Sequence, residues 1–293
     1  MLKKRHSTMK VSIAAIIAFV CIAVILWMLK NKIASFGNGS YLVAVVAAGI
    51  LLTIYTISLT IGREFEIVEQ PSDYPPEGID PLLAGTIIDG QVNQRDVCAA
   101  FYYLAQKGYF DIREYELKKF EFTYNSYPEN ETAHLKQLFD AVFKHADIGD
   151  TIRLSDAAEN LIAAVPRIEK TAYKSIASRK NREIADCSGR ITGFKHSMIR
   201  NRGEKAGTLA AADPDYVYKV LPYAYAFSIT AKLSRNFEAV DIAAPTWYKP
   251  YGVAEDYKFD VIIYNAMLRN LPEQLRNEVF SKTQSSYPII NMK

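Results

Sequence analysis

The sequence has few cysteines, and their arrangement excludes two classes of small protein. Only three occur among 293 residues, Cys21, Cys98 and Cys187. None belongs to a CxxC motif or lies beside a histidine pair, so neither a disulfide framework nor a zinc site is expected. The scarcity fits a reducing compartment. Cys98 lies beside an apolar stripe and is predicted to be buried and inert.

The usual catalytic and nucleotide-binding signatures are also missing. There is no GxxxxGK[ST] loop, no GxGxxG, no HExxH and no GxSxG. The histidines His6, His134, His145 and His196 show no ligand spacing, and we interpret His134 and His145 as helix-surface residues. We therefore expect no cofactor and no metal, and an enzyme stays open only as an unrecognised type that uses scattered carboxylates.

Acidic residues are absent from residues 1–62, which carry six basic side chains. Because the whole chain has a formal net charge of +3, residues 63–293 carry a net charge of −3. A mildly acidic remainder disfavours a dedicated nucleic-acid binder, which usually presents a strongly basic face.

Two long uncharged runs, residues 11–29 and 41–61, predict membrane spans. About 20 apolar residues cross a hydrocarbon core of roughly 30 Å. The turn-rich link between the runs, KNKIASFGNGS, predicts a transmembrane helical hairpin over residues 1–62. A cleaved signal peptide in place of the first span stays open, although Lys30 and Lys32 follow the run and no A-x-A site is present.

The basic residues also predict an orientation for this hairpin. Four precede the first run, two lie in the link, and Arg63 follows the second run. The excess favours cytoplasmic termini, because basic residues concentrate on the cytoplasmic side. The sequence thus predicts an integral membrane protein with two spans, the membrane being a bacterial plasma membrane.

Residues 63–78 are predicted to be a linker. Pro71, Pro75 and Pro76 keep the backbone extended. Apolar residues at helical spacing then predict a first helix in the segment IDPLLAGTIIDG, with Gly90 as its stop.

The stretch NQRDVCAAFYYLAQKG predicts a second helix, with Asn93 as its N-cap and Gly108 as its C-cap. The period then changes to alternation, and YFDIREYE and KFEFTYN predict a β-hairpin. Two helices followed by a hairpin form the outline of a winged helix, and residues 79–128 are assigned to a winged-helix-like domain. This fold binds DNA or docks proteins, so it does not decide the function.

Residues 129–293 are predicted to be a mainly helical cytoplasmic region. Ser155 is expected to cap a helix, Pro166 to kink or end it, and residues 213–238 to form one aromatic-rich helix. The expected fold class is mainly α: a transmembrane hairpin, an α+β winged-helix-like domain and a C-terminal helical region.

A basic stretch covers residues 179–205, where eight basic residues face three acidic ones. It predicts either a patch against anionic lipid head groups or a solvated basic helix and loop. The eight residues of this predicted lipid-contact patch are Arg179, Lys180, Arg182, Arg190, Lys195, Arg200, Arg202 and Lys205.

A second set of residues is a candidate protein-docking surface. Arg95 and Asp96 form a polar pair at the start of the second helix, and several aromatic residues cluster in residues 213–250. The alternative is that these groups cap the helix and fill the core. The candidate docking residues are Arg95, Asp96, Tyr216, Tyr223, Tyr225 and Trp247.

Several stretches of the sequence resemble the YciQ-like predicted membrane proteins, a family of unknown function. They are PPEGIDPLLAGTIIDGQVNQRDVCAAFYYLAQKGYFDI at 75–112, GFK at 193–195, Glu204, LPYAYAF at 221–227 and PTWY at 245–248. The similarity runs from about residue 70 to about residue 250, and the order of the motifs is more specific than any one of them.

The resemblance implies a short member of that family. It lacks the usual N-terminal extracytoplasmic domain and the central membrane helix pair, whose place is taken by residues 178–192. The basic stretch then stands where other members touch the membrane. The resemblance implies no catalytic residues.

These observations predict a membrane-anchored, non-enzymatic protein-interaction module whose partners are the bilayer and another protein. The alternatives are an unrecognised enzyme and a membrane-tethered winged-helix regulator that binds DNA.

Overall fold

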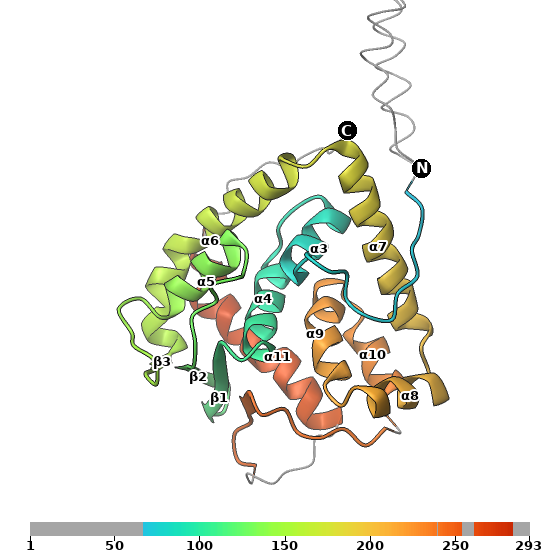
Figure 1. The fold of residues 1–293 in the computed structure, drawn as a ribbon. Helices are drawn as coiled ribbons and strands as arrows, with labels where there is room; N and C mark the ends of the chain where they lie inside the picture. Colours follow the sequence, from blue (N-terminus) through green and yellow to red (C-terminus); the bar gives the residue numbers. More distant parts are fainter. Residues whose placement is uncertain (1–66, 239, 254–260, 284–293) are drawn as a thin grey trace, which may run out of the picture. The chain divides into compact units, whose positions relative to one another are not determined.

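The computed structural model describes residues 67–238, 240–253 and 261–283, which lie in the second of two compact units, residues 66–293. The described part contains nine α-helices and four short strands (Figure 1). In chain order they are α3 (Pro81–Asp89), α4 (Gln94–Gln106), β1 (Phe110–Glu116), β2 (Lys119–Tyr124), α5 (Ala133–Val142), β3 (Thr151–Arg153), α6 (Leu154–Ala177), α7 (Asn181–Arg200), α8 (Glu204–Ala212), α9 (Tyr216–Ala226), α10 (Thr230–Asn236), β4 (Tyr248–Lys249) and α11 (Val261–Glu278), followed by a 3₁₀ turn at Phe280–Lys282.

The strands form one small mixed sheet in the order β3-β2-β1-β4. β1 and β2 pair as an antiparallel hairpin, with Phe110 opposite Tyr124 and Ile112 opposite Phe122. β4 joins the other edge of β1 in parallel, with Tyr248 opposite Ile112. Because alternate residues of a strand share one face, Phe110, Ile112 and Phe122 are all buried.

Aromatic rings connect the inner face of the sheet to the helices that cover it. Phe101 of α4 lies with its ring centroid 6.3 Å from that of Phe110 and 5.5 Å from that of Phe122. Phe139 of α5 lies 6.3 Å from Phe110 on the same face. Rings at these separations add edge-to-face attraction to the burial of apolar area, so the sheet and helices share one core.

The ends of α3 and α4 are set by local residues. Asp80 caps α3 by accepting a hydrogen bond from the Leu83 N–H, and Gly90 ends it with a φ of 78°. The Asp96 carboxylate in the first turn of α4 accepts a hydrogen bond from the backbone N–H of Asn93, the N-cap residue. These residues fix the turn between the two helices.

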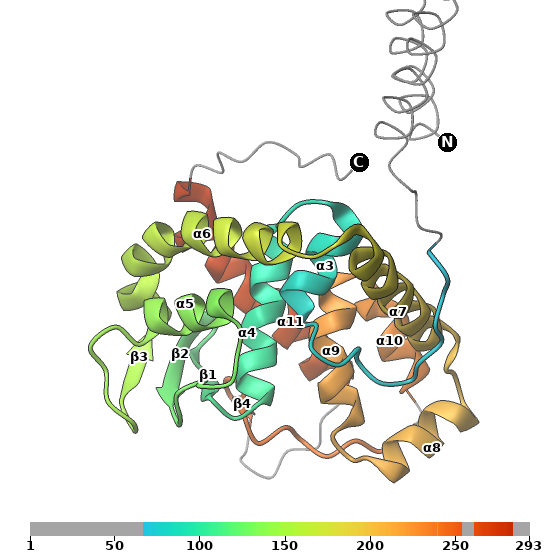
Figure 2. The ribbon, with the colours of Figure 1, turned by 45° about the horizontal axis from the view of Figure 1, so that its top comes forward.

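Helix α4 lies between the sheet with α5 on one side and α7, α9 and α10 on the other, as Figures 1 and 2 agree. All residues of α4 from Asp96 to Ala105 are buried except Tyr103, which is half-buried. The Tyr102 hydroxyl donates to the carbonyl of Met267 in α11 at 2.9 Å. Two helices and a hairpin occur in the predicted order, but the helix that a winged helix would insert into a DNA groove is covered.

Among the residues that the structure describes, no helix is both long and apolar enough to cross a bilayer. The two longest, α6 and α7, are amphipathic, with exposed charged residues such as Asp156, Lys170 and Arg182 opposite a buried face. This finding contradicts the predicted transmembrane hairpin and the location that rests on it, an integral membrane protein with two spans. The predicted spans, 11–29 and 41–61, lie outside the described residues.

Residues 67–78, which we call the strap, run beside α7 before the chain turns back into α3 (Figures 1 and 2). The strap falls within the segment predicted to be a linker. It contacts α7 along much of its length, so it is part of the folded unit.

Candidate functional site

Helix α7 has two different faces. Its inner face carries Cys187, Ile191, Phe194 and Met198, which are all buried against the rest of the unit. The opposite face carries Gly189 and Gly193, which lie one above the other because residues four apart share a side of a helix. We call this second side the glycine face.

The backbone of the strap fills the space that side chains on the glycine face would occupy. The carbonyl oxygen of Val68 lies 2.1 Å from the position that a Cβ atom on Gly189 would take. The carbonyl oxygen of Gln70 lies at the same distance from the Cβ position of Gly193. The Gln70 N–H also donates to the carbonyl oxygen of Gly189 at 3.1 Å. Only glycine at both positions allows this approach.

Polar side chains hold the strap on both sides of the glycines. The Glu69 carboxylate lies 3.0 Å from Nδ1 of His196. Further along, Oδ1 of Asp73 accepts a hydrogen bond from Asn201 at 2.9 Å and lies 3.1 Å from Nζ of Lys205. Acidic strap residues thus meet a basic or donor group on α7 or just beyond it.

The end of the strap is fixed through its backbone. The Tyr216 hydroxyl donates to the carbonyl oxygen of Asp73 at 2.7 Å, and the ring of Tyr74 meets that of Tyr216 edge-on at 5.4 Å. Arg190 donates to the carbonyl oxygen of Glu77 at 3.3 Å. These contacts hold the bend in which the chain turns away from α7 toward α3.

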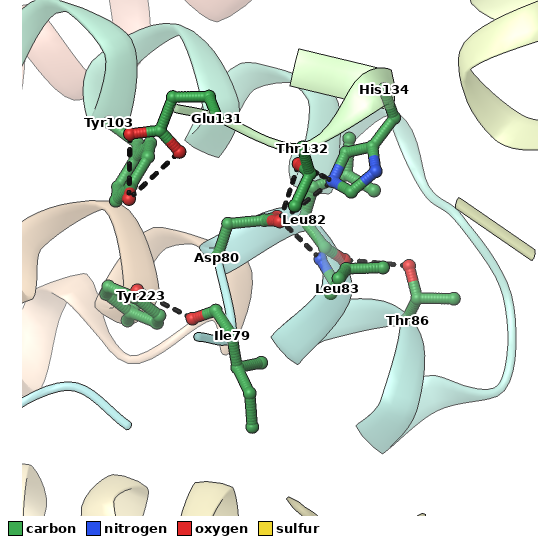
Figure 3. A network of polar contacts seen from close by, with 10 residues as sticks. All are labelled: Ile79, Asp80, Leu82, Leu83, Thr86, Tyr103, Glu131, Thr132, His134 and Tyr223. Atoms are coloured by element: carbon green, nitrogen blue, oxygen red, sulfur yellow. Dashed lines mark hydrogen bonds and ion pairs between the residues drawn. The ribbon is translucent and has the colours of Figure 1, made fainter. Parts of the chain in front are cut away.

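A buried polar network fixes the residues that follow the strap (Figure 3). Oδ2 of Asp80 lies 2.8 Å from Nε2 of His134 and 3.2 Å from the hydroxyl of Thr132. The Tyr223 hydroxyl donates to the carbonyl oxygen of Ile79 at 2.8 Å. Burial raises the pKa of Asp80, but the neighbouring His134 and the hydrogen bonds that the carboxylate accepts outweigh it, so its pKa lies below the ordinary value. The expectation that His134 is a helix-surface residue is wrong, since its side chain is needed inside to balance Asp80.

The strap is held much less tightly than the residues that follow it. The side chains of Ile67 and Val68 are 55% and 63% exposed, whereas Ile79 and Asp80 are 2% and 5% exposed. A segment with few buried apolar contacts opens at low free energy. The strap therefore has a lightly held tip at residues 67–73, and residues 79–80, which follow the strap, form a fixed root.

Four residues of the predicted lipid-contact patch contact other parts of the unit, and four are exposed. Lys205 and Arg190 bind the strap, and Lys195 lies 5.5 Å from the centre of the Phe227 ring. Arg179 donates to Sγ of the buried Cys187. The remaining four, Lys180, Arg182, Arg200 and Arg202, are exposed. Contact of this set with lipid head groups stays a prediction.

The candidate docking surface is corrected, because most of its members lie in the interior. Asp96, Tyr216, Tyr223 and Trp247 are between 0% and 6% exposed, and Arg95 and Tyr225 are half-buried. The tyrosine hydroxyls reach backbone carbonyls of the strap and its root, and Trp247 accepts a hydrogen bond from the Ile112 N–H through its own carbonyl at 2.7 Å. Burial of Tyr216, Tyr223 and Trp247 agrees with the alternative that the aromatic residues fill the core, whereas Arg95 forms a half-exposed ion pair with Asp89.

Asp96 is an unusual interior group. One carboxylate oxygen binds the Asn93 N–H at 2.8 Å, while Oδ1 has no hydrogen-bond partner and lies 2.0 Å from the Cβ position of Gly85. Burial raises the pKa of Asp96 to about 7, more than the Asn93 hydrogen bond and the nearby Arg95 lower it. Arg95 itself pairs with Asp89 and donates to the Ser228 hydroxyl.

The described residues contain no group of three or more His, Cys, Asp or Glu side chains placed to hold a metal ion. Cys98 is buried as predicted, and burial raises the pKa of its thiol. A thiol of this kind stays protonated at neutral pH and is a poor nucleophile.

No protein-family model matches the sequence, and searches of curated proteins and of solved structures find no match either. The resemblance to the YciQ-like proteins therefore stays a prediction.

Proposed function

We propose that this unit is a non-enzymatic protein-interaction module whose docking site is the glycine face of α7. The site receives an extended acidic segment. One observation carries the proposal: the carbonyl oxygens of Val68 and Gln70 occupy the space above Gly189 and Gly193. The chain's own strap fills this site, and a bound partner segment takes the same place.

Two features of the site select the class of segment. The two glycines allow a close approach of main chain, which favours an extended segment over a helix with bulky side chains. His196 and Lys205 border the site and favour acidic residues at the positions of Glu69 and Asp73. The site therefore selects a segment with an extended backbone and acidic side chains.

The interior positions of the other candidate groups weigh against the two alternatives. A DNA-binding regulator would need the surface of α4, but Asp96–Ala105 face the core apart from Tyr103. An enzyme would need reactive groups that a substrate can reach, whereas Asp96 and Cys98 are 0% and 2% exposed.

A labelled peptide with the strap sequence, IVEQPSDYPPEG, tests the proposal on the full chain. In the unchanged protein the strap competes with the peptide. The double variant Glu69→Gln, Asp73→Asn weakens the strap's own charge pairs, so we expect it to bind the peptide more tightly than the unchanged chain does. Fluorescence anisotropy gives both dissociation constants.

The same background then locates the site. Adding Gly193→Ala places a methyl group where the peptide backbone must lie, and we expect at least about tenfold weaker binding. Gly207→Ala in α8 is the matched control, because its Cβ would meet nothing within 4 Å. Equal peptide affinity in the two alanine variants would refute the glycine face as the docking site.

A further inference from the structure

We propose that the segment docked on the glycine face comes from a second copy of this chain, so that two copies exchange their straps. This inference rests on the proposed function and names the partner of the same site. Residues 67–73 of each copy lie on α7 of the other, and residues 79–80 stay with their own copy.

The first argument is complementarity. Each copy carries both the glycine face and a segment that fits it, with Glu69 against His196 and Asp73 against Lys205. Exchange replaces each of these contacts with an identical one. These contacts therefore contribute equally to the closed monomer and to the exchanged dimer. The conformational preference of the hinge then determines which of the two forms is favoured.

The second argument is the unequal anchoring of the strap. Its root is fixed by Tyr223 on Ile79 and by His134 on Asp80, all in the interior. Its tip is held by the backbone approach to two glycines, by partly exposed polar pairs and, at its last residue, Asp73, by hydrogen bonds from Asn201 and Tyr216. The tip can therefore leave α7 while the rest of the unit stays folded.

The third argument is the hinge between tip and root. In the closed form the chain turns back over residues 74–78, with Gly78 at a φ of 71° and the Ile79 N–H bonded to the carbonyl of Pro76. Pro75 and Pro76 favour extended backbone, also for the residue before each proline. A short stiff hinge that must fold back favours exchange over closure. Opened, the five hinge residues 74–78 span roughly 17 Å, so the exchange requires the root of one copy to lie within about that distance of α7 of the other.

One exposed aromatic side chain in the hinge points to the same arrangement. Tyr74 is 42% exposed in the closed form. In a reciprocal exchange the two hinges pass each other at the twofold axis, where the two Tyr74 side chains can cover one another. This contact is absent from the monomer. It helps to offset the advantage of the chain's own strap, which is present at its own α7 at an effective concentration on the order of millimolar.

Carbodiimide crosslinking of the full chain tests the exchange without any substitution, because the reagent joins a carboxylate and a lysine that are in direct contact. Unlabelled and heavy-isotope copies are mixed in equal amounts, opened with a mild denaturant and returned to buffer. Mass spectrometry then counts Asp73–Lys205 crosslinks that join a light and a heavy copy. Complete exchange makes about half of them mixed, since partners pair at random across a twofold dimer.

Lys118 and Glu273, 3.0 Å apart within the body of the unit, are the internal control and should give unmixed crosslinks only. Gly193→Ala should abolish mixed Asp73–Lys205 crosslinks, and Gly207→Ala should keep them. The exchange is refuted if mixed Asp73–Lys205 crosslinks are no more frequent than mixed Lys118–Glu273 crosslinks. Peptide binding that depends on Gly193 in that same case keeps the glycine face as a docking site and removes only the second copy as the source of the segment. If neither mixed Asp73–Lys205 crosslinks nor Gly193-dependent peptide binding is found, the glycine face is refuted as a docking site as well.

Discussion

The carbonyl oxygen of Gln70 lies 2.1 Å from the point where a Cβ atom on Gly193 would be. The two residues are far apart in the sequence, and the contact is between main chains. It explains why a residue with no side chain stands in the middle of a helix, where glycine costs about 1 kcal/mol relative to alanine. Glycine at position 193 allows the backbone of the strap to approach α7 this closely.

Gly193→Ala should therefore release the strap. An extra methyl group in a closed site usually costs about 1–3 kcal/mol. Because the strap is lightly held, it should leave instead, and the free energy of unfolding should fall by less than about 1 kcal/mol. Limited proteolysis should show faster cleavage within residues 67–73, with Gly207→Ala unchanged. A strap as protected as in the unchanged chain would contradict this account.

Acid should loosen the strap through Asp73. Burial raises the pKa of Asp73, but hydrogen bonds from Asn201 and Lys205 and the charge of Lys205 outweigh it, so the folded pKa lies below the ordinary 3.8. The stabilisation is therefore present above pH 3.8 and is lost as pH falls through the folded pKa. Cleavage of the strap by pepsin should rise in this range, and Asp73→Asn should remove the Asp73 part of the rise. Identical pH profiles for the two proteins would exclude the role of Asp73.

Asp96 should make the unit less stable as pH rises. Burial raises its folded pKa to about 7, so its contribution is fully present below pH 3.8 and is lost as pH rises through about 7. Asp96→Asn should flatten this part of the stability profile and be more stable than the unchanged chain at pH 8. Urea unfolding between pH 4 and pH 8 measures the effect. Glu129→Gln, an exposed acid, is the control and should keep the slope.

His134→Ala should destabilise the root of the strap. It leaves the buried Asp80 carboxylate without its closest partner, and such a loss costs about 3–5 kcal/mol. His145→Asn is the control, because His145 is exposed and asparagine tolerates its φ of 65°. Chemical denaturation gives the free energy of unfolding of both variants. If His134 did not balance the Asp80 charge, the two variants would unfold at the same denaturant concentration.

Elements with local signals could be predicted from the sequence. Asn93 and Gly108 bracket the second helix, and the alternation of Phe120 and Phe122 identifies β2, the second strand of the hairpin. Strands β3 and β4 were missed because each is only two or three residues long and exists through pairing with the hairpin. The helix expected over residues 213–238 is broken at Ser228, whose φ of 57° has no clear mark in the sequence.

The docking site could be predicted only in part. The prolines predict an extended segment and the charge count identifies the basic stretch, but the contact between the two is long-range and has no local mark in the sequence. The spacing of Gly189 and Gly193 within the basic helix, together with Glu69 and Asp73 in the linker, was the available indication. The tyrosines of α9 were ambiguous, because a tyrosine whose hydroxyl reaches a carbonyl is as suited to the core as to a surface.

The central claim is that the glycine face of α7 receives an extended acidic segment. The most direct measurement uses the strap peptide with a photoreactive group in place of Gln70, added to the full chain and irradiated. The account predicts labelling of α7 around Gly189–Gly193, accompanied by release of the chain's own strap to proteolysis. Labelling elsewhere, or labelling of α7 that leaves the strap protected, would contradict it.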